Sequence, residues 1–184
     1  MLSDRLPSRR VIAAALATVT LAAGLAADLG RARADDGDPA GWSVLTDPRR
    51  RAFLIATDTA GGPRLLTVAC LRDVDEIVLY ATLAGLAPDR SGVGLSLSVA
   101  DASLDATGST DTIDGAVTLT VDLADGAAAR KALAPRLKRL MTAPGPLVVA
   151  VDGAAPVEIP LEDLPPRRGI AGPWKTFDKV CFGR

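Results

Sequence analysis

Short apolar segments that alternate with polar residues recur through most of the chain after residue 41. The alternation is strict at 93–100 and 117–123, where every second residue is Val or Leu. A period of two places these side chains on one face of a strand, which suits antiparallel sheets with one buried face. The predicted strands are residues 42–46, 52–57, 64–70, 76–82, 93–100, 117–123, 147–151 and 156–161.

Two segments have helical spacing instead, at residues 126–145 and 172–181. Pro135 lies inside the first, and we expect it to kink that helix or to start a second turn. Many strands with few helices predict a mainly β, sandwich-like antiparallel fold with one or two short helices. The apolar helix positions are Leu133, Leu137, Leu140 and Met141 in the first segment and Trp174, Phe177 and Cys181 in the second.

The first 34 residues have the three parts of an export signal. Arg9 and Arg10 lie in a basic start, residues 11–27 carry no charge, and Ala32 and Ala34 supply the small residues that a signal peptidase reads. The alternative is an uncleaved membrane anchor, but a spanning helix needs about 20 strongly apolar residues. The expected organisation is a cleaved signal peptide at 1–34, a flexible tail at 35–41 and a single β-sandwich-like domain at 42–184.

The pair Arg9-Arg10 resembles the twin-arginine export signal of bacteria, although the lysine that usually follows is absent. Paired arginines also occur in general secretory signals, so both routes stay open. Either route predicts a periplasmic or secreted protein.

Charge argues against nucleic acid as a partner. Of the 21 basic and 22 acidic residues, five and two lie in the first 34, which leaves 16 and 20 and a net charge near −4. A mildly acidic protein is not drawn to nucleic acid or to anionic lipid. We expect a protein or envelope partner, and no stable membrane insertion after cleavage.

The residue types exclude several chemistries. The chain has no histidine, so triads that use histidine and histidine-ligated metals are excluded. It has no glycine-rich phosphate motif. We therefore predict no catalytic residue, cofactor or metal ion. The acidic stretch 101–116 could offer oxygen ligands to calcium, but its spacing fits no EF-hand, and a polar hairpin loop is the favoured interpretation. Its acids are Asp101, Asp105, Asp111 and Asp114.

Basic residues cluster at Arg49–Arg51, at Arg167 and Arg168, and at 136–139. Together they could form an anion-binding or partner-binding surface. The near balance of acids and bases favours solvated loop charges instead.

The order of segments resembles small exported bacterial proteins of the invasion-associated locus B type and their relatives among accessory proteins of type VI secretion. The segments are "RLLTVAC", "EIVLYAT", "KALAPRLKRL", "PLVVAVD", "VEIPLEDL" and "WKTFDKVC". The resemblance implies an exported β-sandwich without an active site, which binds a protein or envelope partner. The alternative is a small periplasmic hydrolase with an unrecognised carboxylate site.

The two cysteines of the chain, Cys70 and Cys181, each share an apolar face. An oxidising compartment and a count of two predict a disulfide between them. It would hold the last helix against the β-domain. The alternative is two buried free thiols.

Overall fold

The structure is a computed structural model that describes residues 39–183. The proposed signal residues Arg9, Arg10, Ala32 and Ala34 lie outside the described residues. The elements are β1 (Gly41–Asp47), β2 (Arg51–Thr57), β3 (Arg64–Leu71), β4 (Glu76–Ala81), β5 (Arg90–Val99), β6 (Ala102–Ile113), β7 (Ala116–Asp125), α2 (Ala127–Thr142), β8 (Leu147–Val151), β9 (Val157–Ile159) and α3 (Ala171–Cys181).

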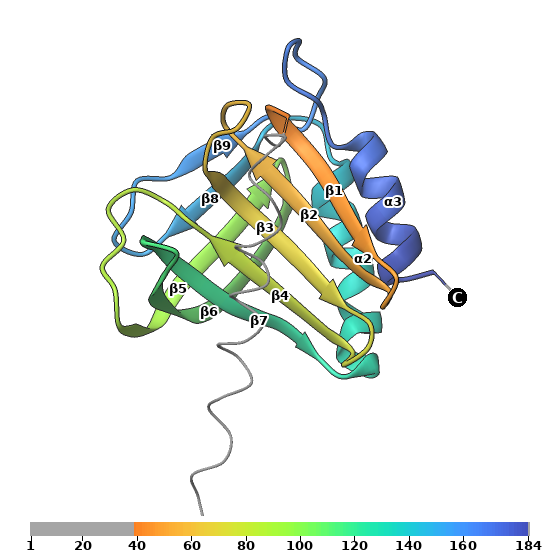
Figure 1. Cartoon of the computed structure of the whole chain (residues 1–184), viewed down its shortest axis with the longest axis horizontal. Helices are drawn as coiled ribbons and strands as arrows, with labels where there is room; N and C mark the ends of the chain where they lie inside the picture. The colour runs from red at the N-terminus through yellow and green to blue at the C-terminus, as the bar shows by residue number, and fades with distance from the viewer. Residues whose placement is uncertain (1–38, 184) are drawn as a thin grey trace, which may run out of the picture. The chain divides into compact units, whose positions relative to one another are not determined.

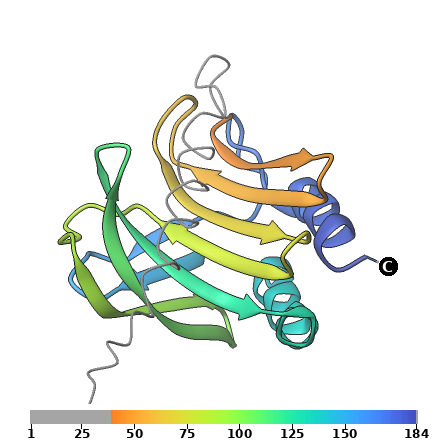
Figure 2. The same cartoon turned by 60° about the horizontal axis from the view of Figure 1, so that its bottom comes forward.

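The described part of the chain is mainly antiparallel β with two short helices, as predicted. Nine strands form one sheet in the order β1-β2-β3-β4-β7-β6-β5-β8-β9. The sheet is strongly curved (Figures 1 and 2), so its inner face encloses the core much as two packed sheets would. Near the outer strands, the Trp42 indole Nε1 donates a hydrogen bond of 2.8 Å to the Pro160 carbonyl and ties β1 to the chain after β9.

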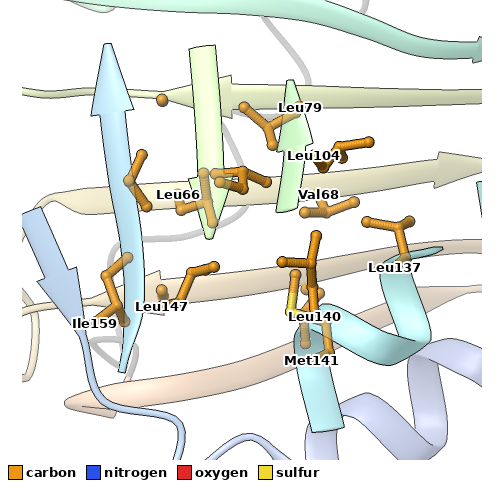
Figure 3. Close-up of a cluster of buried hydrophobic side chains, with 14 of the residues drawn as sticks. Leu66, Val68, Leu79, Leu104, Leu137, Leu140, Met141, Leu147 and Ile159 are labelled. Carbon is orange, nitrogen blue, oxygen red and sulfur yellow. The ribbon is translucent and has the colours of Figure 1, made fainter. Parts of the chain in front are cut away.

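The core fills the inside of this curved sheet. Strands with strict alternation, such as β5, turn their Val and Leu side chains inward. Figure 3 shows Leu137, Leu140 and Met141 of α2 beside Val68 of β3. Burying each large apolar side chain contributes about 1.5 to 3 kcal/mol, so this contact holds α2 on the sheet.

Both helices bury the apolar stripes that the sequence predicts. In α2 these are Leu133, Leu137, Leu140 and Met141, and in α3 Trp174, Phe177 and Cys181. Helix α2 is one element across Pro135 and does not restart there.

Strand β6 corrects the sequence analysis, which favoured a polar hairpin loop for the acidic stretch. Asp105 and Asp111 lie within β6, and Asp101 and Asp114 lie at its two turns. The segment is a strand because β5 pairs with it on one side and β7 on the other, and its alternate residues Leu104 and Thr110 are buried.

Candidate binding groove

Within residues 39–183, the outer edge of β1 has no partner strand along most of its length. The Trp42 N–H donates to the Arg168 carbonyl at 2.9 Å, so it points away from β2. Hydrogen-bonding groups alternate in direction along an antiparallel strand, so the N–H and C=O groups of Val44 and Thr46 point the same way. Among residues 39–183 no strand other than β2 pairs with β1 at these positions.

A groove of about 850 Å³ runs along this open edge. One wall is β1 from Trp42 to Leu45, and the other is the start of α3, with Gly172, Pro173 and Thr176. Helix α3 lies beside β1 in both views (Figures 1 and 2). The buried Oγ of Ser43 belongs to the β1 wall and has no hydrogen-bond partner in the described part of the chain.

The segment before α3 closes one end of the groove. Arg168 and Gly41 form an isolated parallel β-bridge, and the Arg168 N–H donates to the Ala40 carbonyl at 2.9 Å. Gly41 has φ +90°, and a Cβ there would come within 2.2 Å of the Arg168 carbonyl oxygen. Glycine is therefore the residue that permits this close approach.

Cys70 and Cys181 form the predicted disulfide. Their Sγ atoms are 2.06 Å apart and their Cα atoms 5.8 Å apart. Cys70 is the seventh residue of β3, and Cys181 ends α3, so the bond joins the helix to the inner face of the sheet. The disulfide therefore fixes the helix that walls the groove.

Two arginines add to this attachment. Arg72, in the turn after β3, donates from Nη1 to the Gly183 carbonyl at 2.8 Å and to the Cys181 carbonyl at 3.3 Å. Arg130 of α2 donates to the same Cys181 carbonyl and pairs with Asp75 at 3.0 Å. Cations at a helix C-terminus satisfy its last carbonyls and its dipole. The last turn of α3 is thus held by one covalent and several polar contacts.

A second, smaller pocket of about 250 Å³ lies on the other side of Arg168. Its lining includes two carboxylates, Asp58 and Glu158. Arg167 also lines it and forms an ion pair of 2.6 Å with Asp58. This pocket brings together the carboxylates that the hydrolase alternative needs, with one of them already paired.

Acidic side chains gather around Glu76, where β4 pairs with β7. Asp125 lies opposite Glu76 in the pairing of these strands. Burial raises the pKa of Glu76 above its ordinary 4.5, and the charges of Asp125 and Asp122 raise it further. Burial, with the same Asp122, also raises the pKa of the Tyr80 hydroxyl above 10.0.

In contrast, Asp73 has a cationic partner. The Nε of Arg51 lies 3.1 Å from its Oδ1, and this hydrogen bond lowers the pKa of Asp73 below its ordinary 3.8.

Within residues 39–183, no three His, Cys, Asp or Glu side chains are placed to hold a metal ion. None of the described helices has the length and apolarity needed to cross a membrane.

The basic clusters divide between paired and unpaired residues. Arg51 and Arg167 are paired with Asp73 and Asp58, and Arg139 with Asp101. Arg168 is exposed and lines the groove. Sequence reasoning missed the groove itself, because its two walls come from segments far apart in the chain. Comparison of the chain with protein-family models, with curated proteins and with solved structures gives no match.

Proposed function

We propose that the protein is an exported, non-catalytic module of the bacterial periplasm that binds a protein or cell-envelope partner. The observation that carries this proposal is the groove along the open edge of β1. It offers a helical wall and backbone groups that have no partner in the described part of the chain, which suit binding more than chemistry. The resemblance to invasion-associated locus B-type proteins supports the same class of function.

Export is the second part of the proposal. The N-terminal 34 residues have the composition of a cleaved signal, and a disulfide persists in oxidising compartments. Intact-mass measurement of protein from the periplasm tests it. We expect a mature chain that begins after Ala34, and a chain that retains Met1 would contradict cleavage. Replacing Arg9 and Arg10 with lysine should block export if the twin-arginine route is used.

The binding function is tested by capture from a periplasmic extract. Protein purified from the periplasm is immobilised and incubated with extract of the source bacterium, and bound proteins are eluted with an excess of the free protein. We expect a specific partner that free protein displaces. Retention of no protein beyond that on an unloaded matrix would count against the proposal.

The second pocket supports one alternative function, that of a small hydrolase that uses Asp58 and Glu158. Paired carboxylates are the groups that hydrolyse glycosides. The ion pair with Arg167 instead gives Asp58 a structural role. A panel of chromogenic glycosides separates the two functions, since hydrolysis by the wild type that is lost in Glu158→Gln would favour the enzyme.

A further inference from the structure

We propose that the groove beside β1 binds an extended, acidic peptide segment of a protein partner, which joins the sheet as a strand next to β1. This inference rests on the proposed binding function and names its surface and its chemistry. Four features of the groove carry it: the hydrogen-bonding edge, the short side chains of its helical wall, the charge of the bordering segments and the rigidity of the wall.

The edge of β1 already pairs with one residue outside the sheet. The backbone of Arg168 makes hydrogen bonds to Ala40 and Trp42 at the start of the strand, and this pairing is limited to one residue. The outward groups of Val44 and Thr46 continue the same row without a partner in the described part of the chain. An open edge is a template for an added strand, and a bound peptide can begin where Arg168 ends.

The lining of the groove suits one strand. Its helical wall carries Gly172, Pro173 and Thr176, which have short side chains. The free length of β1, residues 43–47, corresponds to about 17 Å of extended chain. Because α3 stands beside the edge, a single extended segment fits there more readily than the whole sheet of a second copy.

The charges around the groove favour an acidic segment. The segments that border it carry five exposed cations, for which no ion pair is found among residues 39–183. They are Arg49 and Arg50 in the turn after β1, Arg168 at the closed end, and Lys175 and Lys179 on α3.

The same segments also carry three acids, Asp47, Asp163 and Asp178, so five positive charges stand against three negative ones. Two of these carboxylates accept backbone hydrogen bonds. Asp47 accepts hydrogen bonds from the N–H groups of Arg49 and Arg51, at 2.9 and 3.2 Å. Asp163 accepts one from Gly169 at 2.7 Å. The excess positive charge would attract an acidic peptide and speed its association.

The wall opposite β1 is fixed before any ligand arrives. The disulfide and the contacts of Arg72 and Arg130 hold α3 at its C-terminal end. A groove that is already formed spends less binding energy on ordering its walls. The same attachment therefore serves the fold and the proposed site.

Fluorescence anisotropy with a synthetic peptide tests the proposal. The probe is an end-blocked, fluorescein-labelled peptide of eight residues in which glutamate alternates with valine. Its control carries lysine in place of glutamate. We expect saturable binding of the acidic peptide, weakened by added salt, and no binding of the lysine peptide. Equal binding of both peptides, or binding of neither, would overturn the proposal.

Variants at Thr46 test the strand geometry. Thr46→Pro removes an N–H that does not pair with β2, so β1 should still form, and circular dichroism checks this. We expect Thr46→Pro to weaken the acidic peptide about tenfold or more, and Thr46→Val, which keeps the N–H, to stay within about twofold. A peptide with N-methyl groups at alternate amides should fail to bind the wild type. The N-methylated peptide still tests the strand pairing if Thr46→Pro does not fold.

The outcomes separate this inference from the proposed function. If Thr46→Pro still captures the periplasmic partner as well as wild type, the protein binds, but not through this edge. If ultracentrifugation shows a dimer that Thr46→Pro dissociates, a second copy occupies the edge, and the peptide proposal is overturned.

Discussion

Glu76 lies in an unfavourable electrostatic environment, because its partner across the β4–β7 pairing is Asp125 and not a base. Asp73 shows the opposite case, since Arg51 stabilises its charged form. These two carboxyls should therefore affect stability with opposite signs as pH changes.

Burial raises the pKa of Glu76 above 4.5 in the folded state, which favours the protonated carboxyl. The stabilisation from protonated Glu76 is therefore fully present below about pH 4.5 and is lost as pH rises through the folded-state pKa. Glu76→Gln keeps the neutral form at all pH values. We expect this variant to have a larger free energy of unfolding than wild type at pH 7, and the two to converge below pH 4.5. Urea denaturation at several pH values measures this.

Asp73→Asn serves as the control. In wild type, the lowered pKa of Asp73 means that its charged form stabilises the fold above about pH 3.8, and this stabilisation is lost as pH falls through the folded-state pKa. The variant lacks that charge, so it should be less stable than wild type at pH 7. A loss of stability at pH 7 in Glu76→Gln would contradict the account of the acidic cluster.

Gly41 is the residue on which the closed end of the groove depends. Gly41→Ala places a Cβ 2.2 Å from the Arg168 carbonyl oxygen and strains a backbone at φ +90°. Gly115→Ala is a matched control, because φ there is +81° and a Cβ would meet nothing within 4 Å. We expect about 1–3 kcal/mol of strain in the control and a greater loss in Gly41→Ala. Equal losses in thermal unfolding would show that the contact with Arg168 does not matter.

At the scale of elements, the alternating apolar residues of β5 and β7 were enough to predict strands, and the stripes of α2 and α3 were enough to predict helices. Strand β6 was not recognised, because its Asp, Ser and Thr residues are also turn formers. One local signal was present: Asp114-Gly115 joins β6 to β7 as a two-residue turn with both φ values positive, which is a typical hairpin connection.

Helix α3 should depend on its disulfide. Replacing both Cys70 and Cys181 with serine opens a cross-link between residues 111 apart in sequence, and we expect a loss of about 2–5 kcal/mol in the free energy of unfolding. Limited proteolysis should cut near α3 before it cuts the sheet. Wild-type protein treated with a reductant is the control and should behave as the variant does. Unchanged stability in both would mean that packing alone holds the helix.

At the scale of the whole described domain, the fold class followed from the sequence and the groove did not. The groove joins β1 to the segment 163–176, which lies more than a hundred residues later in the chain. No local pattern encodes that meeting, because it depends on how far the sheet curves and where Trp42 bonds to Pro160. The cysteine pair was the one long-range contact that counting residues could reveal.

The most direct test of the central claim is amide hydrogen exchange of β1, resolved by residue with NMR. In the free protein, the amides of Val44 and Thr46 should exchange quickly, while those of Ser43 and Leu45, which bond to β2, should be protected. Saturation with the acidic peptide should then protect Val44 and Thr46. Protection of all four amides in the free protein, or continued fast exchange at Val44 and Thr46 with peptide bound, would contradict the account.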